Sequence, residues 1–468
     1  MRGKRVSEAL NGDAVVARVV IAAPGSGHGK TTIAAGVMAA LRARGLKVSG
    51  HKVGPDFIDP SYHALATGRP ARNLDPFLQG EERLVPLLLH GSAGADIAVI
   101  EGVMGLFDGA LGTEGYASTA HVARLLDAPV VLVVDASAAS RSVAAVVLGF
   151  ANYDPRVRLA GVILNKLGSQ RHEDEIVTAL EATGVPLLGA LRRSDDIHAP
   201  SRHLGLVPVG ERDADAQRIL PTLAAWISDG VDLDAVVRVA RNTSTLSGSA
   251  WDPHAEVTYE GPRSVIAAAA GQAFTFRYTE TVELLAAAGV DVVDVDPLRQ
   301  QDLPEDCAGL YFGGGFPEVH AAELSGNAAL RAEVAGAIER GMPVVAECAG
   351  LLYLCRELDG LPMVGAVNAT AAMTKRGKLG YRKAVSLSDN VLAANGQRVT
   401  GHEFHRTEIV PGQGDSPAWG WDRVPEGFAS ASLHASYLHV HWAGYPELAG
   451  RFAAAAHAHT AGLVRDRV

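Results

Sequence analysis

The sequence contains little cysteine: three residues, Cys307, Cys348 and Cys355, in a chain of 468. Three thiols cannot build a disulfide framework or a four-thiolate metal site, so a reducing, cytoplasmic environment is expected. Basic runs are also missing, and 52 Asp+Glu against 42 Lys+Arg give a formal net charge of -10. This balance disfavours a nucleic-acid partner and an anionic membrane surface. Any anionic ligand must therefore be met by local groups.

Long hydrophobic runs are absent as well. The most apolar stretch, residues 129–151, is interrupted by Asp135 and Arg141, so no transmembrane helix is expected. Residues 1–14 lack the apolar centre of a signal peptide, and none is expected. Hydrophobic residues still make up 48% of the chain and charged residues 20%, which is an ordinary globular composition. Because 468 residues exceed the size of one compact core, two domains are expected.

Apolar runs of strand length alternate with helix-length segments through the first half, a pattern typical of a parallel sheet covered by helices. Strands are predicted at residues 15–23, 47–53, 96–101, 130–135, 160–164 and 186–191, and helices at 31–44, 118–127 and 173–183. The periodicity stops over residues 241–262, which are rich in Ser, Thr, Gly and Pro. We therefore predict a first domain over residues 1–245, a linker over 246–262 and a second domain over 263–468.

The second domain shows a further α/β alternation. Strands are predicted at residues 264–270, 291–295, 309–312 and 343–347, and helices at 280–288, 317–340 and 349–358. Shorter, less helical segments follow to about residue 440. The pattern predicts a second α/β unit.

A glycine-rich loop lies between the first predicted strand and the first predicted helix. Its residues are Gly25, Ser26, Gly27, His28, Gly29, Lys30, Thr31 and Thr32. Such a loop turns backbone N–H groups toward phosphate oxygens, while Lys30 reaches the β and γ phosphates and Thr31 holds Mg²⁺. Pro24 replaces the first glycine of the usual pattern, but the strand–loop–helix context favours a phosphate loop over an ordinary turn. Asn165, at the end of another strand, resembles the base-reading residue of P-loop proteins.

Acidic residues follow two other strands of the first half. Glu101 ends a strand where nucleotide sites place a Mg²⁺ ligand, and Asp108 lies in the glycine-hinged loop that follows. Asp56 and Asp59 lie between prolines in a stiff loop, which suits metal binding or substrate positioning, although Asp-Pro is also a common turn sequence. We predict Glu101 and Asp56 as metal ligands and Asp59 and Asp108 as substrate-contacting residues.

A cysteine stands between an apolar strand and a predicted helix in the second half. This position of Cys348 is typical of a nucleophile elbow, in which a helix N-terminus lowers the thiol pKa and a tight turn exposes the sulfur. The N–H groups of Gly314, Gly315 and Ala349 are predicted to stabilise an oxyanion. A buried, inert thiol is the alternative, and it is our interpretation of Cys355.

A thiol nucleophile needs a base, and three nearby histidines compete for this role: His434, His439 and His441. A lone histidine is more often structural, but a cysteine elbow without any histidine would be chemically incomplete. The residues alone leave the choice open.

Several sequence blocks of the chain resemble those of a known protein family. They are the phosphate loop, KVGPDFIDPSYH, EGVMGLFDG, PSRHLGL, FTFRY, YFGGGFPE, AECAGLLYL and ASYLHVHW. Together they resemble the cobyrinic or hydrogenobyrinic acid a,c-diamide synthases over residues from about 19 to 445. The resemblance implies an α/β fold, with an N-terminal dethiobiotin-synthetase-like P-loop domain and a C-terminal class I glutamine amidotransferase domain. It also implies ATP, Mg²⁺ and glutamine, with a corrinoid polycarboxylate as substrate.

The resemblance assigns roles to individual residues. It makes Cys348 the nucleophile and His439 its base. His441 stands where class I amidotransferases often carry a glutamate, so a Cys–His dyad is implied. Lys52, Arg202 and His203 become candidates to meet the charge of the substrate.

These roles predict one reaction. ATP converts a carboxylate to an acyl phosphate, because oxide is a poor leaving group, and ammonia released from glutamine inside the protein stays unprotonated. The a and c acetates are then amidated in two ATP-dependent rounds. Cobyric acid synthase and nickel-sirohydrochlorin a,c-diamide synthase share this plan, but the FIDPSYH block favours the a,c-diamide enzyme. The metal in the ring, the order of amidation and the oligomeric state, including a homodimer, stay open.

A different class of protein is a partitioning-type P-loop ATPase with an inactive amidotransferase module. That class has a second lysine early in the phosphate loop, where this chain has Gly25. An inactive domain also need not keep both Cys348 and His439. The sequence therefore favours an enzyme.

Overall fold

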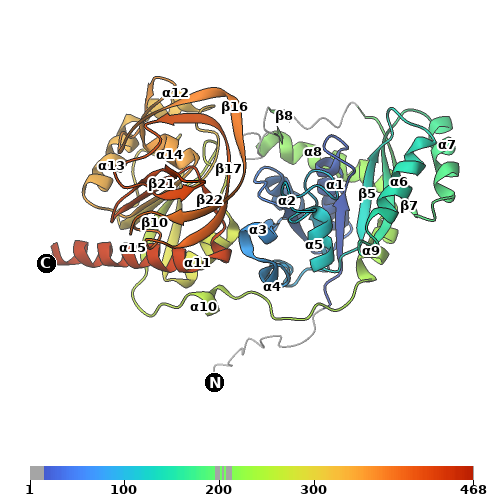
Figure 1. The fold of residues 1–468 in the computed structure, drawn as a ribbon, viewed down its shortest axis with the longest axis horizontal. Helices are drawn as coiled ribbons and strands as arrows, with labels where there is room; N and C mark the ends of the chain where they lie inside the picture. The colour runs from blue at the N-terminus through green and yellow to red at the C-terminus, as the bar shows by residue number, and fades with distance from the viewer. Residues whose placement is uncertain (1–14, 195–200, 203–204, 207–212, 467–468) are drawn as a thin grey trace. The chain divides into compact units, whose positions relative to one another are not determined.

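The computed structural model describes residues 15–194, 201–202, 205–206 and 213–466. It divides into two compact units, one with residues up to Pro76 and Gly80–Trp251, the other with Phe77–Gln79 and Asp252–Val468 (Figure 1). The division after Trp251 falls within the stretch that the sequence predicts as a linker. Within the described ranges no helix is both long and apolar enough to cross a membrane.

The first unit contains a seven-stranded parallel sheet in the order β3-β2-β4-β1-β5-β6-β7. Its strands are β1 (Arg18–Ala22), β2 (Val48–Val53), β3 (Arg72–Leu74), β4 (Ile97–Glu101), β5 (Val130–Asp135), β6 (Leu159–Leu167) and β7 (Leu187–Arg192). Every residue of β1, β2 and β4 is buried, as in parallel sheets covered on both faces. The sequence predicts all of these strands except the three-residue β3.

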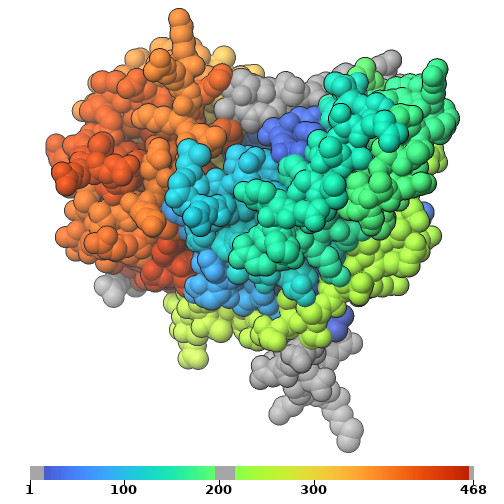
Figure 2. Space-filling model, turned by 45° about the vertical axis from the view of Figure 1, so that its right-hand side comes forward, coloured from blue at the N-terminus to red at the C-terminus, as the bar shows by residue number. Residues whose placement is uncertain are grey.

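Helices surround this sheet (Figure 1). They are α1 (Lys30–Ala43), α2 (Asp59–Thr67), α4 (Glu81–Gly91), α5 (Thr119–Leu125), α6 (Ser142–Tyr153), α7 (Gln170–Glu181), α8 (Asp213–Gly230) and α9 (Leu233–Arg241). The short α3 (Pro76–Gln79) lies at the division of the chain, and its residues Phe77–Gln79 are assigned to the second unit. A two-stranded piece, β8 (Ser201–Arg202) with β9 (Gly205–Leu206), is separate from the sheet. The apolar stretch 129–151 forms β5 and α6, and α6 buries only Val143 and Val147. This segment belongs to the teal surface in Figure 2.

Helix α2 corrects the prediction of a stiff loop around Asp56 and Asp59. Proline is tolerated in the first turn of a helix, because the N–H groups of that turn have no hydrogen-bond partner within the helix. Pro60 occupies such a position. Asp56 Oδ1 accepts the N–H groups of Ile58 (2.8 Å) and Asp59 (3.1 Å). The Asp-Pro sequence therefore starts a helix and places Asp59 in its first turn.

The second unit contains two sheets. The first has the order β11-β10-β12-β13-β21-β20, with only the β20–β21 pair antiparallel. Its strands are β10 (Ser264–Ala269), β11 (Val290–Val295), β12 (Cys307–Phe312), β13 (Val344–Glu347), β20 (Phe428–Ala429) and β21 (Leu433–Ser436). The second sheet has the order β15-β14-β16-β17-β22, and β18 and β19 are attached to it. Its strands are β14 (Cys355–Leu358), β15 (Leu361–Pro362), β16 (Val367–Ser386), β17 (Arg398–Val410), β18 (Trp419–Trp421), β19 (Val424–Glu426) and β22 (His439–Val440).

The helices of the second unit differ from the prediction at two points. They are α10 (Pro253–Glu256), α11 (Thr279–Ala287), α12 (Ala321–Gly326), α13 (Ala328–Glu339), α14 (Ala349–Leu354), the 3₁₀ turn η2 (Trp442–Gly444) and α15 (Glu447–Asp466). The predicted helix over 317–340 is interrupted because the Asn327 side chain accepts the N–H of Leu330 and starts α13 anew. The predicted helix over 349–358 ends at Leu354, and Cys355 begins a strand.

Candidate functional site

The phosphate loop is held in a conformation that needs its glycines. Gly27 and Gly29 have φ angles of 85° and 91°, which residues with side chains rarely adopt. A side chain on Gly29 would also clash with the amide of Asn165, whose Nδ2 donates to His28 O at 2.9 Å. Lys30 Nζ lies 2.6 Å from Met104 O and 3.4 Å from Gly25 O, so its ammonium lies between the phosphate loop and the loop after β4. Backbone N–H groups, a helix N-terminus and this ammonium together suit a phosphate group.

Thr31 directly follows this lysine, and its hydroxyl lies against two acids. Thr31 Oγ1 is 2.6 Å from Glu101 Oε1 and 3.2 Å from Asp59 Oδ2. Glu101 comes from the end of β4 and Asp59 from the start of α2, and both are at least nine-tenths buried. A hydroxyl and two carboxylates are the hard oxygen donors that Mg²⁺ prefers. We call Thr31, Asp59 and Glu101 the oxygen cluster, and its donor set fits a magnesium ion beside the phosphate loop.

Two cationic or polar side chains fix the oxygen cluster. Lys52 Nζ lies 2.6 Å from Asp59 Oδ2, 2.9 Å from Glu101 Oε1 and 3.0 Å from Gly102 O. His63 Nε2 lies 2.6 Å from Glu101 Oε2. Burial works to raise the pKa of Glu101, but Lys52 and His63 hold this pKa below its ordinary value. Burial and the neighbouring Asp56 and Glu101 carboxylates raise the pKa of Asp59, against the effect of Lys52. The cluster therefore holds one firmly ionised carboxylate and one that binds a proton more readily.

The polar residues predicted from the sequence make contacts in the structure that differ from the roles predicted for them. Asp59, rather than Asp56, contacts the Thr31 hydroxyl and shares Lys52 with Glu101, while one oxygen of Asp56 caps α2. The Lys52 ammonium faces the oxygen cluster with three oxygen partners and is 3% exposed. Asp108 Oδ2 accepts the N–H of Gly105 at 2.9 Å and so shapes the loop whose Met104 carbonyl meets Lys30.

The side chains of two further candidates are not described by the structure. Arg202 lies in β8, of which only the backbone is described, and His203 lies outside the described residues. Sequence reasoning missed His63, although a signal was present: it stands four residues after Asp59, on the same face of α2.

The second unit places Cys348 in a strained turn between β13 and α14. Its φ of 49° and ψ of −98° are unusual for a residue with a side chain, as expected of a nucleophile elbow. A side chain at Gly350 would clash with the carbonyl of Phe312, so this tight turn requires glycine there. Cys348 N–H donates to Ser436 O at 2.8 Å, which ties the elbow to β21.

The expected lowering of the Cys348 pKa is not found. Burial raises the thiol pKa well above its ordinary value, and the nearby Glu318 carboxylate adds to this effect. The N–H of Ala349 opposes both, but α14 is only six residues long and its N-terminus cannot outweigh burial. The thiol is therefore neutral in this conformation and needs a base to become a nucleophile.

Residues 313–315, three glycines that follow β12 and that we call the three-glycine loop, lie beside the ring of His439. Gly314 N–H donates to Phe276 O at 2.9 Å and its carbonyl accepts the N–H of Phe276 at 3.0 Å. A Cβ atom on Gly314 would lie 2.7 Å from His439 Cε1. Because its N–H is already used, Gly314 cannot serve as an oxyanion donor in this conformation, contrary to the prediction. Among the described residues, the N–H of Gly315 donates to no backbone carbonyl, and it remains a candidate with Ala349.

The histidines have different surroundings. His434 Nδ1 lies 3.2 Å from Asn390 Oδ1, and the ring packs against Trp419. His441 Nε2 lies 2.8 Å from Gln79 Nε2 and 3.6 Å from Glu280 Oε2.

His439 alone of the three lies against the three-glycine loop in the contacts described above. Its ring packs edge-on against Phe276 at 4.8 Å and stacks on His402 at 5.0 Å. Burial, with a smaller effect of His405, lowers the pKa of His439 to about 3, so the imidazole is neutral and can accept a proton. The geometry therefore favours His439 as the base.

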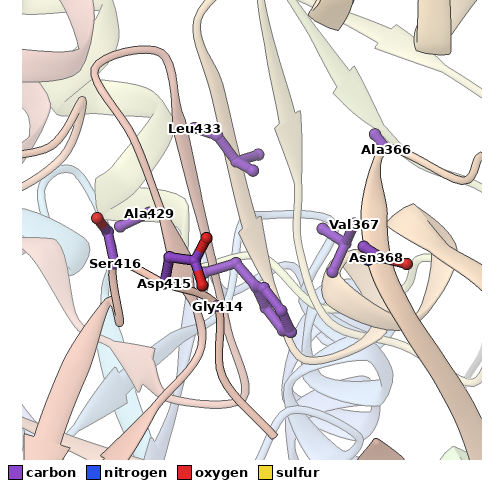
Figure 3. Close-up of a pocket in the computed structure, with 9 residues that line it drawn as sticks. Ala366, Val367, Asn368, Gly414, Asp415, Ser416, Ala429 and Leu433 are labelled. Atoms are coloured by element: carbon purple, nitrogen blue, oxygen red, sulfur yellow. The ribbon is translucent and has the colours of Figure 1, made fainter. Parts of the chain in front are cut away.

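A separate hollow of about 240 Å³ opens in the second unit (Figure 3). It is lined by Ala366, Val367, Asn368, Gly414, Asp415, Ser416, Phe428, Ala429 and Leu433. None of the predicted site residues lines it, and its polar side chains form no catalytic set. The predicted site residues of this unit lie around Cys348 instead.

Comparison with known proteins places each unit in a described domain family. Residues 19–207 match the CobQ/CobB/MinD/ParA nucleotide binding domain. Residues 265–446 match the CobB/CobQ-like glutamine amidotransferase domain. The P-loop site lies in the first match and the Cys348 elbow in the second, so the predicted fold class is confirmed.

Curated relatives match almost the whole chain. The hydrogenobyrinate a,c-diamide synthase of Streptomyces coelicolor is 56% identical over 93% of this chain and 97% of the relative. The Thermobifida fusca protein of the same name is 56% identical over 95% of this chain and 98% of its own. A cobyrinate a,c-diamide synthase of Synechococcus sp. is 42% identical over 93% of this chain and 97% of the relative. This chain therefore belongs to the hydrogenobyrinate and cobyrinate a,c-diamide synthase family.

Proposed function

We propose that the protein uses ATP and glutamine to convert the a and c acetate carboxylates of hydrogenobyrinic acid to amides. The observation that carries this proposal is the pairing of two sites on one chain. One combines a phosphate loop with the oxygen cluster, and the other combines Cys348 with the neutral base His439. The names of the relatives, 56% identical over nearly the full length, support the substrate.

The first unit activates the carboxylate. ATP transfers its γ-phosphoryl group to the substrate carboxylate and leaves as ADP, which gives an acyl phosphate with phosphate as a good leaving group. A bound Mg²⁺ would neutralise the phosphate charge in this step. Lys30 and the loop N–H groups bind the phosphate oxygens. Thr31, Glu101 and Asp59 would hold the metal, while Lys52 and His63 keep Glu101 ionised and fixed. We propose this role for Asp59 in place of Asp56, because Asp59 contacts the Thr31 hydroxyl and shares the Lys52 ammonium with Glu101.

The second unit releases ammonia from glutamine. His439 takes the thiol proton as Cys348 Sγ attacks the side-chain amide carbon, and a tetrahedral oxyanion forms. The N–H groups of Gly315 and Ala349 are the candidates to stabilise it. His439 then gives the proton to the leaving nitrogen, ammonia departs, and water hydrolyses the thioester to glutamate. Released within the same molecule, ammonia reacts with the acyl phosphate before it is protonated.

The metal-free ring is the substrate that the comparisons favour. The two hydrogenobyrinate relatives are 56% identical to this chain, against 42% for the cobyrinate relative. The compartment we propose is the cytosol, since all three cysteines are free and buried, as in a reducing environment.

The function is tested by incubating the protein with ATP, Mg²⁺ and glutamine plus either the metal-free or the cobalt ring. Mass spectrometry should show two amides formed on the metal-free ring, at the a and c acetates, with one ATP used for each. Amidation at other side chains would instead indicate a cobyric acid synthase. Amide formation only on the cobalt ring would reverse the proposed ring preference.

A further inference from the structure

A histidine base beside a thiol needs a partner on its other ring nitrogen. When an acceptor takes the Nδ1–H, the lone pair is left on Nε2, where the thiol proton can be received. The usual third acid is missing here, because His441 stands at that position in the sequence. His441 itself is turned toward Gln79 and Glu280, so it does not supply the missing contact.

The structure places another carboxyl group beside His439. Glu347, the last residue of β13 and the neighbour of Cys348 in the chain, has Oε2 3.5 Å from His439 Nδ1. Both side chains are at least nine-tenths buried. Neither His439 Nδ1 nor Glu347 Oε1 has a hydrogen-bond partner among the described residues. A separation of 3.5 Å is longer than a good hydrogen bond, but catalytic hydrogen bonds are often long before substrate binds.

We propose that Glu347 is the positioning acid of the amidotransferase site: its carboxylate accepts the Nδ1–H of His439, which leaves Nε2 free to take the proton of Cys348. Glu347 touches neither glutamine nor the thiol in this role. It selects the tautomer of His439 and stabilises the imidazolium that forms when the proton arrives. This inference rests on the glutaminase activity proposed above.

The surroundings of Glu347 make this role depend on pH. Burial raises the pKa of Glu347 to about 8, against the effects of Tyr311 and Trp442. The titratable groups around it are Tyr311, whose hydroxyl lies 3.3 Å from Oε2, His439, and Cys348 beside it in the chain. The phenol and the thiol have pKa values raised above their ordinary ranges, so both are neutral at pH 8.

The direction of the pH dependence follows from the proton on Glu347. Below pH 8 the carboxyl group is protonated: its O–H can donate to Nδ1, which puts the ring hydrogen on Nε2 and blocks the base, and its carbonyl oxygen accepts more weakly than a carboxylate does. Above pH 8 the carboxylate accepts the Nδ1–H. Glutamine hydrolysis should therefore rise with pH, with a midpoint near the Glu347 pKa of about 8.

The test compares Glu347→Gln with Glu426→Gln. Glu426 is a matched control: it is also a buried acid of the second unit with a raised pKa, but its carboxylate binds Ser436 and the N–H of Tyr437. E347Q should lower kcat for glutamine hydrolysis roughly 100-fold, leave the KM for glutamine nearly unchanged and abolish the pH step. Ammonium-driven amidation should persist. E426Q should keep both the pH step and a rate within a few-fold of the parent. The proposal is overturned if E347Q retains the parental rate and pH profile.

A second variant covers the case in which E347Q fails to fold. Tyr311→Phe removes the hydroxyl beside Glu347 Oε2 but keeps the carboxyl group. It should raise the Glu347 pKa and move the pH step of glutamine hydrolysis upward, whereas an unmoved step would contradict the proposal. Cys348→Ser separates this inference from the proposed function. If C348S still hydrolyses glutamine, the function itself fails; if C348S is inactive and E347Q is not, only the role of Glu347 fails.

Discussion

Single residues separate the two chemistries of this protein. Lys30 lies in the phosphate loop of the first unit, and no residue of the Cys348 site belongs to that loop. Lys30→Ala should therefore lower ATP-dependent amidation at least 100-fold, because it removes the cation that meets the phosphate charge. Glutamine hydrolysis should survive. The measurement is glutamate release beside amide formation, and undiminished amidation would contradict the P-loop assignment.

The acids around Thr31 give a sharper test, because the structure assigns them different contacts. Asp59→Asn should lower ammonium-driven amidation roughly 10- to 100-fold, since it removes a charged oxygen from the proposed magnesium site. Asp56→Asn should cost much less, because an asparagine oxygen caps the start of α2 as well as aspartate does. Equal losses of ammonium-driven amidation in the two variants would support Asp56 as a metal ligand instead.

The thiol and the histidines are distinguished by the ratio of glutamine-driven to ammonium-driven amidation. Cys348→Ser and His439→Asn should each reduce this ratio by roughly 10⁴-fold, because a site whose groups act together fails when either is lost. His441→Asn should change it far less, since His441 faces Gln79 and Glu280. A collapse of the ratio in His441→Asn with none in His439→Asn would reverse the choice of base.

Elements rather than single side chains hold the amidotransferase geometry. The three-glycine loop after β12 approaches His439 so closely that a Cβ on Gly314 would lie 2.7 Å from Cε1. Gly314→Ala should displace this ring and lower glutamine hydrolysis roughly 100-fold, with ammonium-driven amidation retained. Gly326→Ala is the matched control: Gly326 lies in α12, where an added Cβ meets nothing within 4 Å. Equal rates in the two variants would show that the loop does not position the base.

At the same scale, the elements show how far periodicity can predict a fold. Apolar runs predicted six strands of the first sheet, because buried parallel strands are apolar along their whole length. The hydrophobic pattern predicted helices through Asn327 and Cys355, and both predictions were wrong at these residues. A side-chain cap ends one helical run and starts another at Asn327, while the apolar run after Cys348 continues from α14 into β14. A short apolar run is compatible with helix and strand alike, so only its partners decide.

For the whole molecule, the two reactions should be coupled through ammonia made by the same chain. A mixture of the Lys30→Ala and Cys348→Ser variants contains one working site of each kind, but on different molecules. With glutamine as the only nitrogen source at neutral pH, the mixture should form little amide, because ammonia that escapes into water becomes ammonium. The rate should match that of free ammonium at the concentration released. Full recovery of the parental rate would show that ammonia travels through solvent.

The sequence by itself determined the two α/β units, the phosphate loop, the cysteine elbow and the family resemblance, because these depend on local spacing. A glycine that must turn, a lysine after it and a thiol between strand and helix are all readable along the chain. The tertiary structure decided which distant groups meet. It brought Asp59 and Glu101 to the Thr31 hydroxyl and His63 to Glu101, used the N–H of Gly314 in a backbone hydrogen bond, and set Glu347 beside His439. It also reversed the expected pKa shift of Cys348, since burial is a property of the packed fold that no neighbouring residue in the sequence reveals.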